Sequence, residues 1–595
     1  MLSFLGFKIS NKTAVLAAVL TAFVIAGFLP AFNGGFTNWD DESYVLKNPS
    51  IQSFTLDKTP SFFLTFSNSN YHPLTMLSYA IEHSIFGNSQ GVYHTTNILL
   101  HLLNCFLVFR LIYLLSGKLY VAFAVALLFG IHPLRVESVA WISERKDVLY
   151  AFFYLFALLQ YFHYRVSGGK KYFLLFAFSF LFSLLSKGSA VTLPFAALLL
   201  DFFLEGKFEK KRLISMLPFA AISILFTITG ILAQATSGAI TQENTGFLKN
   251  LAYGVSGIGF YLEKLLVPNN LSNLYTRNIS VSNLIFLVLF SAAAFFAVIR
   301  KSKIMLFGIL FFLVTITPSL QFVPLGEGVH ADRYSYIPSI GLFFIAIVLA
   351  DKFYEYSGKR AAVKYLLIFS LAAAACTFTL LTYQRARMWE NSLTLWSSTL
   401  KINPLNITAL NNRGAAYNSL AQYDKALADY DAVLKLDPNN GLAHYNYGLT
   451  YINLNRLGEA REFLNTSMKL NPRMKEQSMA LLSICDDLGR KASALKLPEL
   501  PPTDKIAARL FNSGNQKLKL GLYGDAIVDF TAAIALDSKK AEYYNNRGIV
   551  YTNTGQFEKA RIDFGKALLL KQDYTNARNN LEKLESFIKA AQYKK

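Results

Sequence analysis

Long apolar runs separated by short polar breaks fill the chain up to about Tyr383. A helix needs roughly 20 mostly apolar residues to cross the hydrocarbon core of a bilayer. The pattern therefore predicts a multi-span α-helical membrane domain over residues 1–384, with about eleven spans. The predicted spans are Ala14–Phe32, Thr96–Leu115, Tyr120–Ile131, Val148–Tyr164, Tyr172–Leu185, Ala190–Leu204, Leu213–Leu232, Val281–Ile299, Ile304–Leu320, Tyr334–Ala350 and Tyr365–Leu381.

Lys and Arg residues concentrate in alternate connections between these spans. Short loops rich in basic residues favour the cytoplasmic side, so we expect the N-terminus inside and the C-terminal domain outside. We expect the membrane to be a bacterial inner membrane, or the ER membrane of a eukaryote. The segment Leu248–Val267 mixes charged and apolar residues, so we expect it to lie in the interface or to re-enter. The outer loops are then residues 33–93, 132–147, 233–280 and 321–333.

A period of 34 residues runs through the C-terminal part, relating Gly414 to Gly448 and Gly514 to Gly548. This helix–turn–helix period is the signature of tetratricopeptide (TPR) repeats. The whole chain is therefore predicted to be all-α, a membrane domain followed by a TPR solenoid. The predicted segments are a junction half-repeat at 385–405, TPR repeats at 406–497 with a degenerate third, a Pro-rich linker at 498–505, TPR repeats at 506–574 and a capping helix at 575–595.

Asparagines recur on the first helices of these repeats, at Asn412, Asn446 and Asn546. Asn side chains can hydrogen-bond the backbone of an extended peptide, so these residues are candidates for an acceptor groove. The alternative is that they cap and solvate helices.

Composition agrees with a membrane protein. Only 16% of the residues are charged, against about 25% in soluble domains. The net charge of +20 does not indicate nucleic-acid binding, because topology explains the basic residues in short loops. The three cysteines indicate no disulfide framework.

The first outer loop carries the consecutive carboxylates Asp40 and Asp41. Crowded carboxylates raise one another's pKa, and such a pair can supply a general base or coordinate a divalent cation. The alternative is the solvated start of a loop or a helix cap. Because the sequence has no close metal-ligand spacing, we expect no metal site among these residues. A requirement for a divalent cation stays open as an alternative.

Basic residues recur in the other outer connections, and Arg or Lys at a membrane surface suits a phosphate. Membrane anchoring with neutralisation by Glu144 and Asp147 is the alternative. Polar residues at this depth are candidates for function, and all of these lie on the predicted outer side. The phosphate-binding candidates are Arg145, Lys146, Lys187 and Arg333, supported by His132, Arg135, Glu137 and Asp332.

Several strings then resemble one family in order along the chain. They are Trp39-Asp40-Asp41, Tyr71-His72-Pro73-Leu74, Tyr93-His94 with Asn97 and His101, His132-Pro133 with Glu137 to Trp141, Arg145-Lys146-Asp147, Ser186-Lys187, and Asp332-Arg333-Tyr334 before the repeats. Together they are similar to the TMTC family, the transmembrane and TPR-containing protein O-mannosyltransferases of the GT-C class, in a bacterial-type form. One departure is Asp332, where the family tends to have Glu.

The resemblance implies a polyprenyl-phosphate-linked sugar donor, typically mannose, and Ser/Thr hydroxyls of exported proteins as acceptors. Asp40 or Asp41 would be the general base, and Arg145, Lys146, Lys187 and Arg333 would hold the donor phosphate. Exported protein or peptide would bind through the TPR groove. Two alternatives stay open, namely a non-enzymatic membrane scaffold for envelope proteins and a GT-C transferase acting on lipid or polysaccharide.

Overall fold

The computed structural model describes residues 10–236, 246–276, 278–320, 330–494 and 503–593. Within these ranges the regular elements are helices, and the one isolated β-bridge joins Ser67 to Asn70. The predicted all-α class is thus confirmed. Contacts divide the chain into the units Met1–Ala416 and Tyr417–Lys595. The string Pro498–Pro502 and parts of the predicted loops 233–280 and 321–333 lie outside the described residues.

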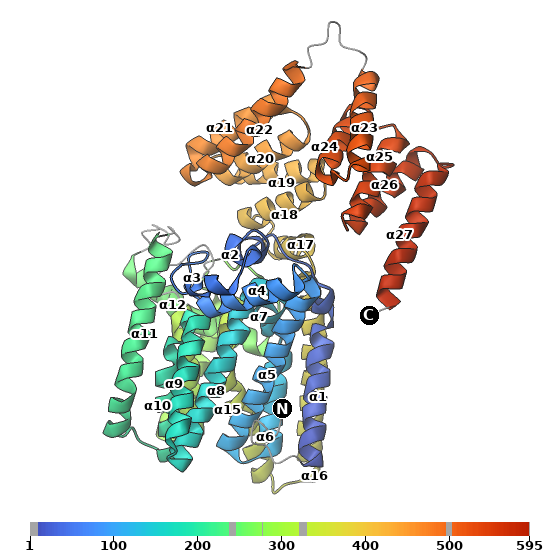
Figure 1. The fold of residues 1–595 in the computed structure, drawn as a ribbon. Helices are drawn as coiled ribbons and strands as arrows, with labels where there is room; N and C mark the ends of the chain where they lie inside the picture. The colour runs from blue at the N-terminus through green and yellow to red at the C-terminus, as the bar shows by residue number, and fades with distance from the viewer. Residues whose placement is uncertain (1–9, 237–245, 277, 321–329, 495–502, 594–595) are drawn as a thin grey trace. The chain divides into compact units, whose positions relative to one another are not determined.

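Every predicted apolar span contains a helix, and Figure 1 shows the long helices of the first unit side by side. Six described helices are long and apolar enough to cross a membrane, or seven if a pair bent by 58° at His132 is one span. α9 and α14 are shorter, at 17 and 14 residues. The number of eleven spans therefore stays a prediction. The helices are α1 (Asn11–Phe28), α5 (Gln90–Ser116), α6 (Leu119–Ile131), α8 (Arg145–Ser167), α9 (Lys170–Ser186), α10 (Leu193–Glu205), α11 (Lys210–Thr236), α13 (Val281–Ile299), α14 (Lys303–Ile316), α15 (Ser339–Tyr356) and α16 (Ala361–Met388).

The segment expected in the interface forms the helix α12 (Phe247–Leu266), which packs on α13. A Cβ atom added at Gly259 would lie 1.9 Å from the carbonyl oxygen of Asn283. Only glycine therefore allows the two backbones to approach so closely. Whether α12 lies in the interface stays a prediction.

The charged residues assigned to the inner side meet at one end of the bundle. Lys118 pairs with Asp351 at 2.5 Å, and Arg165 pairs with Glu205. Three helices at this end, α5, α8 and α10, end at Gly117, Gly168 and Gly206 with φ of 67°, 72° and 80°, the left-handed conformation that glycine adopts without strain.

The predicted outer loop 33–93 folds into a layer of short helices at the other end. Its apolar core includes Tyr44, Ile51 and Tyr79, and it also takes in Ile142 from the 132–147 segment. The elements are η1 (Leu29–Asn33), η2 (Glu42–Leu46), α2 (Pro49–Gln52), η3 (Leu56–Lys58), α3 (Thr59–Phe62) and α4 (Pro73–Phe86).

Residues 132–147 are buried along their whole length, whereas the sequence pattern predicts an outer connection there. The apolar side chains Val136, Val139 and Ile142 pack inward, so the charged residues between them are carried into the protein. The segment consists of η4 (Pro133–Arg135), α7 (Val136–Ala140) and η5 (Ile142–Glu144).

The second unit is a series of helix pairs. A Cβ atom at Gly448, Gly514 or Gly548 would lie 2.6–2.8 Å from the side chain sixteen residues later, namely Leu464, Phe530 or Phe564. The glycine of each first helix therefore makes room for a large side chain of the second. The helices of the repeats and the cap, the first of which begins in the first unit, are α18 (Ile407–Ser419), α19 (Tyr423–Leu436), α20 (Gly441–Asn453), α21 (Leu457–Leu470), α22 (Lys475–Ala494), α23 (Thr503–Lys519), α24 (Tyr523–Leu536), α25 (Ala541–Asn553), α26 (Phe557–Leu570) and α27 (Thr575–Tyr593).

Two details differ from the repeat pattern. The degenerate third repeat is a single helix, α22, within the described residues. The junction half-repeat, α17 (Ser392–Ile402), belongs by its contacts to the first unit, as does the start of α18. α17 begins with a capping box between Asn391 and Thr394, a local signal that fixes a helix start.

Candidate active site

Asp41 anchors the first outer loop. Its carboxylate accepts hydrogen bonds from the backbone N–H of Thr37 at 2.8 Å and of Ser143 at 3.0 Å, and from both hydroxyls. Burial raises the pKa of Asp41 to about 6, although the hydrogen bonds from Ser143 and Thr37 lower it. A carboxylate with four donors, at 1% exposure, is occupied in holding the loop against η5.

Asp40 is placed differently, one residue before Asp41. Its backbone carbonyl accepts from Ser43 and Tyr44, while its carboxylate accepts no hydrogen bond from the described residues. Burial raises the pKa of Asp40; Lys146 and Arg333 oppose this, and Glu144 adds to it. A partly exposed carboxylate with a raised pKa and no fixed donor can accept a proton.

Three of the four predicted phosphate-binding cations meet around Glu144. Its carboxylate lies 3.1 Å from Nζ of Lys146, 3.5 Å from Nζ of Lys187 and 3.2 Å from Nε of Arg333. Burial alone would raise the pKa of Glu144, but these three cations lower it well below its ordinary value. Glu144 therefore remains a carboxylate at the centre of the cluster.

Two further carboxylates hold the same cations. Lys187 lies 2.5 Å from Asp147, and Arg333 pairs with Glu137. The side chains of Lys187 and Arg333 are 16% and 17% exposed, whereas those of Glu137, Glu144 and Asp147 are at most 2% exposed. The acids therefore lie beneath the cations and orient them. We refer to Lys146, Lys187 and Arg333 with Glu137, Glu144 and Asp147 as the charged cluster.

Arg145 does not join this cluster. Its guanidinium pairs with Glu82 at 2.5 Å, donates to Asn97 at 2.9 Å, and stacks over the rings of Tyr79 and Tyr93. At 1% exposure it ties α8 to α4 and α5. The structure therefore corrects the prediction that Arg145 belongs with the other three cations.

Of the four supporting residues predicted from the sequence, one lies in the charged cluster and three lie outside it. Glu137 lies in the cluster, but His132 bonds the carbonyl of Leu265 at 3.1 Å. Arg135 is fully buried and donates to Ser335 at 2.8 Å. Asp332 faces away from the cluster, accepting from Tyr275 at 2.6 Å and from Arg385 at 3.2 Å. These three side chains connect the elements that frame the site.

Sequence reasoning missed the role of the tryptophans. All four tryptophans of the chain gather beside Asp40. Trp39 stacks on Trp141 at 4.4 Å and lies 5.3 Å from Trp396, while Trp141 and Trp389 are 5.3 Å apart. Trp389 and Trp396 are seven residues apart, but Trp39 and Trp141 lie far from them in the sequence, so no spacing pattern could have revealed the whole cluster.

Asn38 links this loop to the junction. Its side chain accepts from Nε1 of Trp396 at 2.7 Å and donates to the carbonyl of Asn412 at 2.8 Å. Its backbone N–H donates to Ser392 at 2.9 Å. The loop that carries Asp40 is thus held directly by α17 and by the start of α18.

The groove asparagines lie on first helices of their repeats, as predicted: α18, α20 and α25. Asn446 is 9% exposed. Asn546 donates to Asn515 at 2.6 Å and accepts from Asn545. Asparagines thus pair with one another between neighbouring first helices, and their binding of a peptide stays a prediction.

Comparisons with known proteins agree with the repeats and the motifs. Residues 407–440, 430–462 and 541–584 match the tetratricopeptide repeat family. The protein O-mannosyl-transferase F38B6.6 of Caenorhabditis elegans is 24% identical over 67% of this chain and 59% of its own length. Human TMTC3 is 24% identical over 65% and 48%, and mouse TMTC2 is 39% identical over 16% and 11%. The peptide-binding TPR protein YrrB aligns with 31% of this chain and 96% of its own at 22% identity, with a TM-score of 0.15.

The chain spans about half the length of the curated relatives that it matches most extensively. The aligned region exceeds the repeats alone, since 427 residues align with the C. elegans relative. The curated homologues of this chain are therefore the protein O-mannosyl-transferases of the TMTC family, which confirms the resemblance read from its motifs.

Proposed function

We propose that this protein is an integral-membrane glycosyltransferase that transfers a sugar, mannose by resemblance, from a polyprenyl-phosphate donor to Ser/Thr hydroxyls of exported proteins. The observation that carries the proposal is the free carboxylate of Asp40 beside the charged cluster. A base and a phosphate-binding set side by side are the two groups that this transfer requires. The names of the homologues support the same reaction class.

In the proposed reaction, the acceptor hydroxyl oxygen attacks the anomeric carbon of the sugar. The bond between that carbon and the phosphate oxygen breaks, and the polyprenyl phosphate leaves with the bonding electrons. Asp40 takes the proton of the hydroxyl. Lys146, Lys187 and Arg333 stabilise the negative charge on the leaving phosphate, as cationic donors do in phosphate chemistry.

The carboxylates of the cluster do not prevent phosphate binding. Lys has three N–H donors and Arg has five, so each cation can keep its buried carboxylate and still donate to a ligand. The exposed side of Lys187 and Arg333 faces away from those acids, since the acids are almost fully buried. The acids therefore act as positioning groups for the cations.

The other parts of the chain have matching roles in this proposal. The lipid tail of the donor stays in the bilayer, which requires a site at the membrane edge. The apolar helices supply the membrane domain, and the repeats would bind the acceptor protein on the periplasmic or luminal side. Trp39, next to Asp40, lines a cavity of about 510 Å³ that offers a place for an acceptor segment.

The test is transfer of radiolabelled mannose by the purified full chain from polyprenyl-phosphate mannose to a Ser/Thr-containing exported protein. We expect Asp40→Asn to abolish transfer. The control Asp57→Asn removes an exposed carboxylate of the same outer loop that does not line the cavity next to Trp39, and should leave transfer intact. Normal transfer by Asp40→Asn would exclude Asp40 as the general base.

Two results would favour the alternatives. Label found in lipid or polysaccharide but not in protein would assign a different acceptor. Absence of transfer by the unaltered chain, together with stable capture of envelope proteins, would indicate a scaffold.

A further inference from the structure

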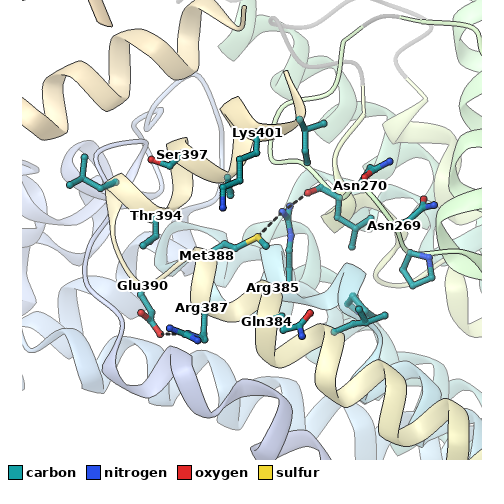
Figure 2. A pocket seen from close by; sticks show the side chains of 17 residues that line it. Asn269, Asn270, Gln384, Arg385, Arg387, Met388, Glu390, Thr394, Ser397 and Lys401 are labelled. Atoms are coloured by element: carbon teal, nitrogen blue, oxygen red, sulfur yellow. Dashed lines mark hydrogen bonds and ion pairs between the residues drawn. The ribbon is translucent and has the colours of Figure 1, made fainter. Parts of the chain in front are cut away.

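A second cavity lies at the junction of the first unit, apart from the charged cluster. It has a volume of about 840 Å³ and is formed by the end of α16, by α17 and by the segment after α12. Figure 2 shows Lys401 reaching from α17 toward the end of α16, where Arg385 and Met388 lie. None of the residues assigned to sugar transfer lines this cavity.

The lining carries cationic groups with unused donors. Lys401 forms no ion pair within the described residues, and Nε of Arg385 is buried there without a hydrogen-bond partner. Arg385 is 5% exposed and is held in place by Asp332 at 3.2 Å and by the carbonyl of Leu271. Arg387 is 64% exposed, and its contact with Glu390 is 3.8 Å, a separation at which an exposed pair contributes little.

The position of the cavity identifies the kind of ligand. The apolar run of α16 ends at Leu381, which lines the cavity, and Leu380 just before it is 62% exposed. On the other wall, Leu266 and Val267 are 68% and 47% exposed just before Pro268. Within the described residues, the polar side of the cavity thus carries three cations, amides and the single carboxylate of Glu390, so cations outnumber anions there. Exposed apolar side chains lie on the other side, the arrangement that an anionic lipid head group with its chains requires.

We propose that this cavity binds the phosphate of an anionic phospholipid and thereby fixes α17, the start of the solenoid, to the membrane surface. The phosphate would lie between Arg385, Arg387 and Lys401. The side chains of Gln384 and Ser397 line the same cavity and would bond the rest of the head group. The acyl chains would follow Leu381 and Leu266 into the bilayer.

The test measures binding of phosphatidylglycerol to the detergent-purified full chain by native mass spectrometry. The double variant Arg387→Gln/Lys401→Gln removes two exposed cations and spares Arg385, whose contacts hold the fold. We expect its affinity for phosphatidylglycerol to fall about tenfold or more, since each basic residue near an anionic lipid contributes roughly 1 kcal/mol. The matched control Arg360→Gln/Lys364→Gln removes two exposed cations at the other end of α16 and should bind like the unaltered chain.

Three outcomes would overturn the proposal. Equal loss in both double variants would show that net charge alone attracts the lipid. Equal binding of phosphatidylcholine would remove the requirement for an anionic lipid. Full displacement by millimolar inorganic phosphate would identify a soluble phosphate as the ligand. Sugar transfer is a separate readout, so failure of this proposal leaves the proposed reaction unaffected.

Discussion

At the residue scale, Asp40 and Asp41 are adjacent, yet their carboxylates have different partners. Thr37 donates to one carboxylate oxygen of Asp41 and Ser143 to the other, so Asp41→Asn puts an amide N–H₂ against the donors of one of these two residues and leaves them unsatisfied. We expect it to lower the free energy of unfolding by about 1–3 kcal/mol, and Asp40→Asn to leave stability unchanged. Thermal unfolding of both variants in detergent compares them. Equal midpoints would contradict the assignment of Asp41 as the anchor.

The charges around Asp40 predict a pH dependence with opposite signs for two variants. A base works only when ionised, so transfer should fall as pH decreases through the raised pKa of Asp40. Lys146 lowers this pKa, so Lys146→Gln should move the acid limb of kcat/KM to higher pH. Glu144 raises it, so Glu144→Gln should move the limb to lower pH. Shifts in the same direction would exclude Asp40 as the titrating base.

At the scale of elements, α14 and α15 approach through a pair of glycines. A Cβ atom on Gly341 would lie 2.4 Å from the carbonyl oxygen of Gly308, a backbone atom that cannot rotate away. We expect Gly341→Ala to separate the helices and lower stability by about 1–3 kcal/mol. The control Gly230→Ala, in α11, meets no atom within 4 Å and should be neutral or stabilising by about 0.5–1 kcal/mol. Thermal unfolding measures both variants, and an equal loss of stability in Gly341→Ala and Gly230→Ala would contradict this contact.

At the scale of the whole molecule, two sets of charges mark the two ends of the helix bundle. Lys118 with Asp351 belongs to one end, and Lys187 with Asp147 to the other. Which end faces the cytoplasm is a prediction from the distribution of basic residues. If it is right, cysteines at Asn68 and Glu558 react with an impermeant reagent from outside.

The same labelling experiment needs a cysteine on the opposite face as its control. Lys207→Cys should react only after the membrane is permeabilised. Cys376 is exposed, so it is first replaced by Ser. Labelling of Lys207→Cys in intact cells, or protection of Asn68→Cys, would contradict the orientation and separate the site from the exported side.

Local patterns in the sequence determined the elements. Apolar runs identified the helices of the predicted spans, because each helix must present apolar side chains to lipid or to its neighbours. The 34-residue period identified the repeats, because one packing contact recurs in each, as Gly514 with Phe530 and Gly548 with Phe564 show. Motifs also named Asp40 and the three cations of the charged cluster.

Only the tertiary structure decided which of these candidates act together. Arg145 and Lys146 are neighbours, but successive positions on a helix face different directions, so one meets Glu82 and the other Glu144. Asp40 and Asp41 lie just before η2 and also differ, since Thr37 and Ser143 bond only the carboxylate of Asp41. Such pairings join residues far apart in the chain, and their geometry depends on packing that no local pattern encodes.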